Sequence, residues 1–425
     1  RQLKKLYQWI TVHEQEIMDA LYMDLNKSNF EAYATEIGIV KEEIRYTLRH
    51  LRKWAAPKRV PTPITQFPSK SFIYPEPYGI VLIMSPWNYP FQLTIAPLVG
   101  AICAGNCAVV KPSAYSPHTT KVMADMLREL FQEKYIAVVE GGRQENQALL
   151  NEKFDYIFFT GSVNVGKYVM EKASAHLTPV SLELGGKSAN IIFNDCNWEA
   201  AIDGVQLGIL FNQGQVCCAG SRVFVQEDIY DKFVAELVNA FQHINVGDPL
   251  NPETQMGAQI NRRQADKILS YVQIAKEEGA TIACGGDYYT ENGCEKGSFV
   301  QPTLITNVTN DMRVAQEEIF GPVAVVIKFK TEDEVIALAN QSTYGLGGAV
   351  WTKDIHRALR VARSIETGRM WVNTYNQIPE GAPFGGYKQS GIGRENDKAI
   401  LDAYSQTKNI MINLNDAPSG FYPAK

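Results

Sequence analysis

The sequence lacks the signatures of several broad classes of protein. Its six histidines and seven cysteines, in 425 residues, form no CxxC or HExxH motif, and no metal site is expected because zinc sites depend on such spacings. A net charge of -5 argues against nucleic acid as the main partner, since phosphate binding needs clustered Lys and Arg. The most apolar stretch, residues 91–110, contains Pro97 and Asn106, so a buried helix and strand are predicted there rather than a membrane span.

The cysteines and the first residues indicate the compartment. An odd number of cysteines scattered over a long chain does not resemble a disulfide framework, and this pattern favours a reducing environment. The first residues show no charged-then-apolar signal layout, although the sequence starts at Arg1 rather than at a methionine. A cytoplasmic protein without membrane attachment is therefore expected.

Apolar periodicity divides the chain into two or three units, as its length suggests. Residues 1–58 have the pattern of amphipathic helices, and prolines break residues 58–77 into extended segments. A second α/β set begins near residue 198, and the last apolar strand is at residues 408–414. Between these parts strands alternate with helices, which predicts a doubly wound α/β layer with parallel strands. The predicted strands are 78–84, 107–111, 135–140, 154–159 and, closing the series, 180–193.

A cysteine pair, Cys217 and Cys218, is the first candidate for chemistry. It lies on a predicted turn between a helix that ends at Gly214 and a strand that begins near Ser221. A cysteine on a turn reaches a cleft more readily than one inside a buried helix, which suits a nucleophile. The alternative is two small buried apolar side chains, and the spacing by itself favours neither interpretation.

Two further polar residues lie at predicted strand ends. Glu183 precedes Gly185-Gly186, where the backbone is uncrowded and a carboxylate can move as a general base requires; taken alone, a structural role is the commoner one. Asn88 lies between Pro86 and Pro90, and a rigid amide suits donation to an oxyanion, worth about 3 kcal/mol. The alternative for Asn88 is a helix cap.

Three turns should meet at the carboxyl edge of the predicted sheet, where such folds bind ligands. They are Pro86-Trp87-Asn88, Lys111-Pro112-Ser113 and Thr160-Gly161-Ser162. The last one opens a helix directly after a strand, so its free amides could hold a pyrophosphate, although it is not a GxGxxG motif. A cofactor crevice is expected at this edge.

Taken together, these segments resemble the aldehyde dehydrogenase superfamily, in its order and over essentially the whole chain. The resemblance rests on seven motifs: Pro86-Trp87-Asn88, Lys111-Pro112, Gly161-Ser162, Glu183-Leu184-Gly185-Gly186-Lys187, Gly214-Gln215-Val216-Cys217, Glu317-Glu318-Ile319-Phe320-Gly321-Pro322 and Pro383-Phe384-Gly385-Gly386.

The resemblance implies NAD(P)-dependent oxidation of an aldehyde to a carboxylic acid. Cys217 is then the nucleophile that forms a thiohemiacetal and a thioester, Glu183 activates the hydrolytic water, and Asn88 forms the oxyanion hole with the backbone N–H of Cys217. The implied cofactor residues for NAD or NADP are Trp87, Lys111, Ser113, Ala114, Gly161, Ser162, Leu184, Glu318 and Phe320. The implied substrate tunnel comprises Tyr89, Phe91, Val216, Cys218, Tyr375 and Ile378.

The resemblance also implies a division into domains. A dinucleotide-binding domain is expected at residues 1–58 and 78–185, and an α/β catalytic domain at residues 186–395. Residues 59–77 and 405–425 are expected to form a β oligomerisation arm. The terminal strand, near residues 408–415, should pair with another subunit in a homodimer or homotetramer, because an unpaired strand edge is usually covered.

The sequence departs from the family pattern in two respects. Ala114 stands where members that prefer NAD often have a Glu, so use of both NAD and NADP is expected. The part up to about Gly186 resembles the class 3 branch, whereas the rest resembles the class 1/2 and betaine-aldehyde branch, which suggests a mosaic. Two alternatives to the main interpretation are a CoA-acylating aldehyde dehydrogenase, which commonly lacks the Glu found here at Glu183, and a non-catalytic protein on the same scaffold.

Overall fold

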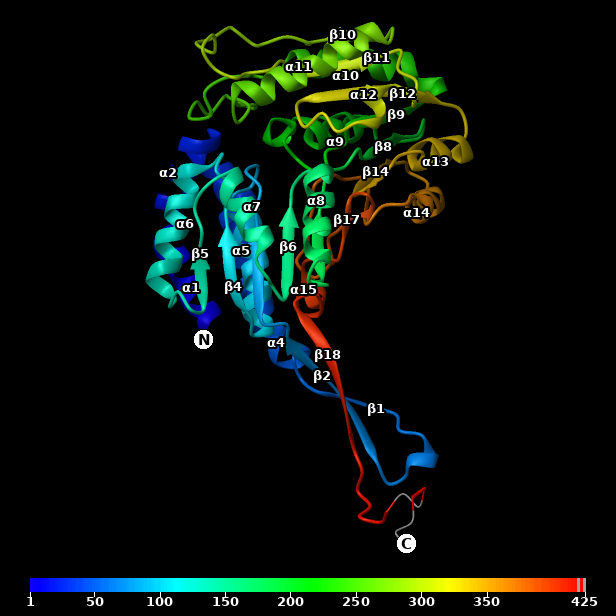
Figure 1. Cartoon of the computed structure of the whole chain (residues 1–425). Coiled ribbons are helices and arrows are strands. Elements are labelled where there is room, and N and C mark those ends of the chain that lie inside the picture. The colour runs from blue at the N-terminus through cyan, green and yellow to red at the C-terminus, as the bar shows by residue number, and fades with distance from the viewer. Residues whose placement is uncertain (419–420, 423–425) are drawn as a thin grey trace.

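Two α/β layers and a projecting β arm make up the computed structural model, which describes residues 1–418 and 421–422 (Figure 1). The first layer is built on a six-stranded sheet of order β17-β7-β6-β3-β4-β5, in which all neighbours are parallel except β17 and β7. Its strands are β3 (Ile80–Met84), β4 (Cys107–Lys111), β5 (Ile136–Val138), β6 (Tyr156–Thr160), β7 (Val180–Glu183) and β17 (Gly391–Ile392).

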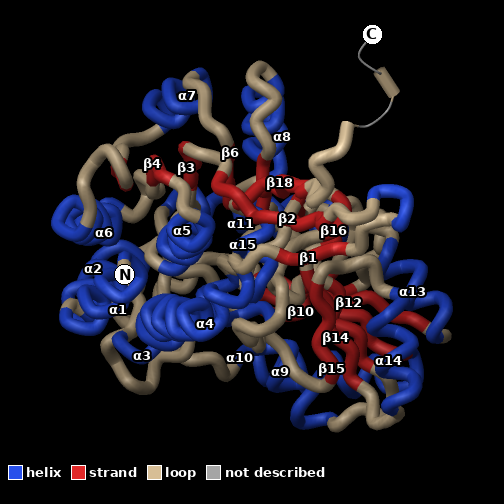
Figure 2. Tube along the Cα trace, turned by 90° about the horizontal axis from the view of Figure 1, so that it is seen from below, coloured by secondary structure: helices blue, strands red, loops and turns tan. Residues whose placement is uncertain are grey.

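Both faces of this sheet are buried, as is usual for parallel sheets covered by helices. Consecutive side chains of a strand point to opposite sides of the sheet, so each strand contributes to two cores. Val81 and Ile83 belong to one hydrophobic core with the N-terminal helices, while Leu82 and Met84 belong to another core with α7 and α8. The crossover helices are α5 (Gln92–Ala104), α6 (Pro117–Leu130), α7 (Arg143–Asn151) and α8 (Val163–Ser174). The N-terminal helical layer consists of α1 (Gln2–Val12), α2 (Glu14–Leu25), α3 (Asn29–Ala32), the π-helical turn η1 (Tyr33–Ile37) and α4 (Gly38–Trp54). Figure 2 shows α1, α2 and α4 side by side below the sheet.

The structure corrects one predicted strand. Residues 180–193 do not form a single strand that closes the first sheet. They form β7 in the first sheet and β8 (Ala189–Ile192) in the second, separated by Gly185-Gly186. A continuous apolar run looks the same whether both halves are buried in one sheet or in two, so periodicity could not show the change.

The second layer is a seven-stranded sheet of order β10-β11-β12-β9-β8-β14-β15, antiparallel only at β10 and β11. Its other strands are β9 (Arg222–Gln226), β10 (Thr281–Cys284), β11 (Thr303–Thr306), β12 (Val323–Phe329), β14 (Gly347–Trp351) and β15 (Arg369–Val372). The surrounding helices are α9 (Trp198–Leu210), η3 (Phe211–Gly214), η4 (Glu227–Ile229), α10 (Tyr230–Gln242), α11 (Arg262–Glu277), α12 (Arg313–Gln316), α13 (Glu332–Asn340) and α14 (Ile355–Ser364). A two-stranded ribbon pairs β13 (Tyr344–Gly345) with β16 (Tyr387–Lys388).

The C-terminal part of the chain returns to the first layer. After β17, helix α15 (Asp397–Ala403) packs on α5, and Ile400 and Tyr404 join the first core. Residues 391–392, which were expected in the catalytic domain, therefore lie in the first sheet. The chain then leaves the layers as β18 (Ser405–Ile412).

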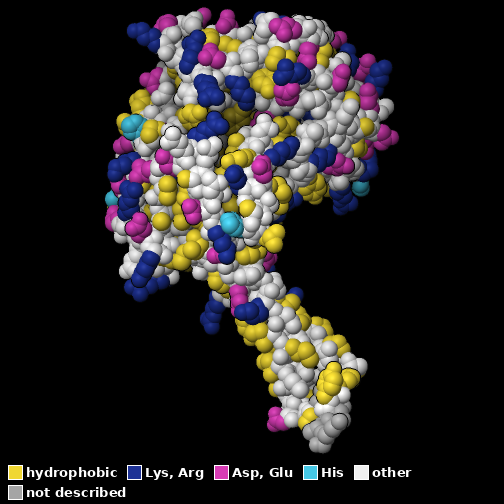
Figure 3. Space-filling view, viewed as in Figure 1, with side chains coloured by type: hydrophobic (Ala, Val, Ile, Leu, Met, Phe, Trp, Pro, Cys, Tyr) yellow, Lys and Arg dark blue, Asp and Glu magenta, His cyan; other side chains and the backbone are white. Residues whose placement is uncertain are grey.

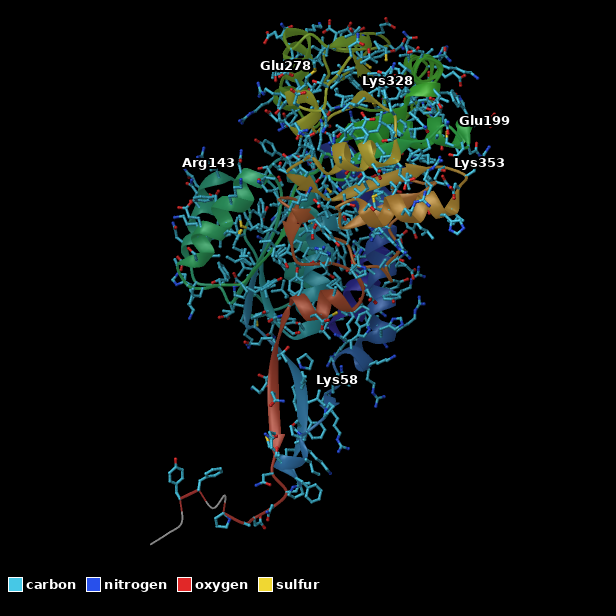
Figure 4. The ribbon with its side chains drawn as sticks, turned by 90° about the vertical axis from the view of Figure 1, so that its right-hand side faces the viewer. Lys58, Arg143, Glu199, Glu278, Lys328 and Lys353 are labelled. Carbon is cyan, nitrogen blue, oxygen red and sulfur yellow. The ribbon has the colours of Figure 1, made fainter. Side chains whose placement is uncertain are left out.

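The arm projects away from both layers, and Lys58 lies near its start (Figures 1 and 4). It is a three-stranded antiparallel sheet of β1 (Lys58–Val60), β2 (Lys70–Pro77) and β18, and the turn η2 (Ile64–Gln66) lies between β1 and β2. The terminal strand was expected to pair with another subunit. Here β18 pairs with β2 of its own chain along its whole length, and its other edge is free within the described sheet. Residues 419–420 and 423–425 of the expected arm lie outside the described residues.

Within the described residues, no helix has both the length and the apolar character needed to cross a membrane.

Candidate active site

The carboxyl ends of β3, β6 and β7 meet at one edge of the first sheet, as expected for parallel strands. Asn88 follows β3, Gly161 and Ser162 follow β6, and Glu183 is the last residue of β7. These strands are direct neighbours in the sheet, so residues that are far apart along the chain reach the same edge at the strand ends and in the short turns that follow them. This edge faces the second layer.

The cysteine pair comes from the second layer, on the loop between η3 and β9. Asn212 and Gln213 both have left-handed backbone conformations, with φ of 49° and 56°, so the chain turns sharply after α9. The amide Nδ2 of Asn212 donates to the backbone oxygen of Gln215 at 3.1 Å, and the Gln215 side chain accepts from the N–H of Ile260 at 3.0 Å. These hydrogen bonds fix the loop that carries Cys217.

Asn88 bridges the two layers. Its Nδ2 donates to the backbone oxygen of Gln215 at 3.0 Å, and its own backbone oxygen accepts from Asn212 Nδ2 at 3.2 Å. A carboxamide carries two N–H groups, so one of them remains for an oxygen bound beside Cys217. The Asn88 side chain is almost fully buried, and the alternative role as an end cap of α5 is not seen, because the cap residue of that helix is Phe91.

A cavity of about 160 Å³ lies between the layers and brings the candidates together. Cys217 lies at this cavity and is partly exposed, whereas Cys218 is buried. A hollow between the two layers is visible in Figure 3. The cavity is lined by Pro86, Trp87, Asn88, Leu93, Thr160, Gly161, Ser162, Glu183, Leu184, Gly185, Cys217, Gln264, Lys267, Glu318 and Phe320.

Burial shapes the acidity of this site. Hydrogen bonding with Cys218, burial, and the nearby carboxyls of Glu318 and Glu183 raise the pKa of the Cys217 thiol well above its usual value. Burial also raises the pKa of Glu183 well above the usual range, opposed by the charge of Arg394. Within the described part of the chain neither carboxyl oxygen of Glu183 has a hydrogen-bond partner. Such a side chain is free to swing, as a general base must.

Two glycines allow the site to close tightly. A Cβ on Gly185 would lie 2.2 Å from Glu318 Oε2, and one on Gly186 would lie 2.5 Å from the backbone oxygen of Cys217. The N–H of Gly186 donates to Glu318 Oε1 at 3.2 Å. Any larger residue at position 186 would therefore push on the backbone of Cys217, which no side-chain movement can relieve.

Glu318 and Phe320 approach from the segment before β12. Burial raises the pKa of Glu318 to about 7, and the ring of Phe320 meets the ring of Trp87 edge-on with centroids 5.4 Å apart. Phe320 has a φ of 63°, a strained conformation for a bulky residue, and such strain is often found at ligand sites. The cavity thus has an aromatic end, a partly buried carboxyl and the start of a helix.

This arrangement agrees with the family to which the sequence is similar. The sequence pattern of the aldehyde dehydrogenase family matches residues 1–410 of this chain. The chain belongs to the aldehyde dehydrogenase family. A betaine aldehyde dehydrogenase from Brucella anthropi is 44% identical over 355 residues, which is 83% of this chain and 73% of that protein.

Solved structures of other family members have the same fold. Betaine aldehyde dehydrogenase from Staphylococcus aureus, in complex with NAD+, is 37% identical with a TM-score of 0.94, and the match covers 100% of this chain and 84% of that one. An NAD+ complex of aldehyde dehydrogenase from Bacillus cereus is 37% identical with a TM-score of 0.92, covering 97% and 83%. The expected family, α/β fold class and activity class, NAD(P)-dependent aldehyde oxidation, are confirmed.

Some residues predicted from the family resemblance lie away from the cavity. Lys111 is buried at the end of β4, where its Nζ donates to the backbone oxygens of Pro112 and Gly141, both at 2.7 Å. Ser113 and Ala114 follow it on the surface side of the same turn. None of these three residues lines the cavity.

The predicted tunnel residues differ in their surroundings. Phe91 is fully buried in the core of the first layer, and Tyr375 is buried in that of the second, where its hydroxyl donates to the backbone oxygen of Cys218 at 2.8 Å. Neither Phe91 nor Tyr375 lines the cavity. Tyr89 packs on the core of the second layer, as do the buried residues Val216 and Cys218, whereas Ile378 is exposed.

Sequence analysis missed three polar residues at or near the site. Gln264 and Lys267 lie three positions apart on one face of α11 and line the cavity, but on a charged amphipathic helix they look like any solvated face. Glu395 is a buried carboxyl whose pKa is raised well above its usual range by burial and by Glu183. A single Glu in a Gly-rich loop carries no signal of burial.

Proposed function

We propose that this family member oxidises its aldehyde through a thioester on Cys217. One observation carries the proposal: Cys217, Asn88 and Glu183, from separate segments and both layers, line one cavity together with Trp87 and Phe320. A nucleophile, a donor for an oxyanion and a mobile carboxylate in one cleft are what acyl formation and hydrolysis require.

The residues act in sequence. The Cys217 sulfur, as a thiolate, adds to the carbonyl carbon, and the oxygen becomes an oxyanion held by Asn88 and the backbone N–H of Cys217. The C–O double bond re-forms as the aldehyde hydrogen leaves with its electron pair, which gives a thioester. Glu183 removes a proton from water as the water attacks, the C–S bond breaks, and the acid and the Cys217 thiolate are released.

The nicotinamide cofactor supplies the acceptor for the hydride. The cavity fits such a group, because the amides at the start of α8 can bind phosphate and Lys267 adds a positive charge. Glu318 and the rings of Trp87 and Phe320 lie where a ribose and a flat ring would be held. In this proposal Gly161, Ser162 and Leu184 contact the cofactor as well, and Lys111, Ser113 and Ala114 bind its adenosine end.

Covalent trapping tests this function. Cys217→Ala should abolish aldehyde-dependent reduction of NAD, whereas Cys218→Ala should retain most of the activity. Quenching the wild-type reaction with a panel of aldehydes, including betaine aldehyde, should leave an acyl group on the peptide that contains residue 217. Activity in Cys217→Ala, or transfer of the acyl group to added CoA instead of water, would contradict the proposal.

The adenosine side of the crevice should accept NADP as well as NAD. Ala114 is exposed and has no carboxylate of its own, so position 114 adds no negative charge that would repel a 2'-phosphate. The proposal fails if NADP supports no turnover at concentrations roughly a hundredfold above the working NAD level, a margin that corresponds to about 2.7 kcal/mol.

The arm and the compartment complete the proposal. Ile410, Met411 and Ile412 of β18 are exposed apolar residues on a projecting sheet, which supports a role of the arm in a homodimer or homotetramer. The activity is proposed to be cytoplasmic. Sedimentation of the full chain, compared with a variant carrying Ile410→Lys and Ile412→Lys, should show a smaller assembly for the variant.

Two features of the chain's organisation are proposed as well. Residues 1–58 and 78–185 bind the cofactor, and residues 186–395 supply the nucleophile. The two parts derive from different branches of the family, class 3 for the first and class 1/2 or betaine-aldehyde for the second. Separate comparisons of residues 1–180 and 190–425 should then find different subfamilies, and one subfamily for both would contradict the mosaic.

A further inference from the structure

A buried ion pair lies in the N-terminal helical layer, outside the candidate active site. Lys27 Nζ and Glu36 Oε1 are 2.6 Å apart, and both side chains are fully buried. Removing two charges from water costs several kcal/mol each, so a buried pair is a poor way to gain stability. The contacts of the pair indicate a role other than stability.

The pair holds both ends of the turn that carries Asn88. Lys27 Nζ donates to the backbone oxygen of Asn88 at 3.2 Å and lies 4.2 Å from the centre of the Tyr89 ring. Glu36 Oε2 accepts from the N–H groups of Phe91, at 2.8 Å, and Gln92, at 3.1 Å, where α5 begins. A carboxylate is favoured at a helix start by the free amides and the helix dipole.

The two charged residues come from elements that are shaped for this contact. Lys27 follows α2 after Asn26, which ends that helix in the left-handed conformation. Glu36 lies on η1, a π-helical turn between α3 and α4, and such turns are frequent at functional sites. The carboxylate uses one oxygen for Lys27 and the other for the start of α5, so the pair acts as one unit.

Asn88 is thus held from two sides. Its backbone oxygen accepts from Lys27 and from Asn212, and its side chain donates to Gln215, two residues before Cys217. Without Lys27 the turn would keep its link to the nucleophile loop and the contacts of Glu36 at the start of α5, but the Asn88 backbone oxygen would lose its hydrogen bond from the helical layer. The direction of the second amide N–H of Asn88 would then be less well defined.

We propose that Lys27 and Glu36 are positioning residues that fix the Asn88 amide towards the oxygen of the aldehyde bound to Cys217. This rests on the proposed function, in which Asn88 is the oxyanion donor. Loss of such a donor costs about 10²–10³ in rate. Loss of its anchor leaves the amide present but misdirected, so Lys27→Met should lower kcat by roughly 10–100-fold, part of that effect.

The test compares Lys27→Met with a matched ion pair in the same helical layer. Lys41 pairs with Glu14 between α4 and α2, and Lys41→Met removes a Lys of the same length without touching the Asn88 turn. We expect Lys27→Met to lower kcat, with an unchanged KM for NAD and an unchanged rate of Cys217 alkylation by iodoacetamide, because alkylation forms no oxyanion. Lys41→Met should keep the kcat of the wild type.

A double-mutant cycle separates positioning from general damage. In an Asn88→Ala background, Lys27→Met should cause less than a threefold further loss, because the group it positions is gone. Equal losses in both backgrounds, a slower alkylation of Cys217, or wild-type kcat in Lys27→Met would each overturn the inference. If Lys27→Met does not fold, Glu36→Gln, which keeps the shape of the side chain, is measured in the same cycle with the same expectations. Full activity of Asn88→Ala alone would instead contradict the proposed function.

Discussion

Replacing Glu183 by Gln should separate hydride transfer from hydrolysis. The amide is the same size as the carboxyl, and within the described residues neither carboxyl oxygen has a hydrogen-bond partner that could be lost. Burial raises the pKa of the carboxyl and so favours its neutral form, which the amide resembles. The substitution should therefore leave the fold and the cavity intact and remove only the group that takes a proton from water.

The magnitude follows from the role. A general base contributes about 10²–10⁴ in rate, or about 3–5 kcal/mol of barrier. Only the hydrolysis of the thioester needs this base, so the loss should fall on steady-state turnover. Because burial raises its pKa, the Glu183 carboxyl becomes a base only at a higher pH than an ordinary carboxyl does. Hydrolysis by the wild-type protein should accelerate with pH through that raised pKa, while the Gln variant should show no such rise.

Rapid mixing with aldehyde and NAD, followed by nicotinamide absorbance, measures both steps. The Glu183→Gln variant should produce a fast burst of about one reduced cofactor per Cys217, followed by turnover reduced by the factor above. Cys217→Ala should give no burst, and Cys218→Ala should behave like the wild type. A Glu183→Gln variant without a burst would refute the reasoning, since Glu183 would then be needed for acylation as well.

Three other substitutions test separate parts of the structure. Gly186→Ala places a Cβ against the backbone of Cys217 and should lower kcat about a hundredfold, measured at saturating substrate, with a melting temperature that falls by only a few degrees. Ala114→Glu adds a carboxylate beside Lys111 and should lower kcat/KM for NADP about tenfold or more while leaving that for NAD unchanged; equal losses would contradict the cofactor proposal. Burial, with a smaller contribution from the charge of Glu380, raises the pKa of Glu43 to about 8. The folded protein therefore holds a proton that the unfolded chain releases above pH 4.5, and up to about 5 kcal/mol of stability is lost as the pH rises from 4.5 to 8. Glu43→Gln should remove this decline in urea unfolding at pH 5 and pH 9, and parallel curves for both proteins would show that Glu43 is not its source.

The sequence alone determined the order of elements and the family. Apolar side chains at period two or 3.6 report which residues face a core, and this places strands such as 107–111, where prediction and structure agree. Turn residues with special chemistry then mark the strand ends. Glu183 and Asn88 were found in this way, because the carboxyl ends of parallel strands share one edge whatever the details of packing.

Only the tertiary structure decided which layers these residues face. Periodicity reports that a side chain is buried but not which segment covers it, so the change of sheet between β7 and β8 and the pairing of β18 with β2 were not predictable. For the same reason the sequence did not predict the Lys27–Glu36 ion pair or the position of Lys267 at the cavity, since each depends on separate segments that meet in the fold. Contacts of this kind follow from close packing of whole layers, and no local pattern of residues encodes them.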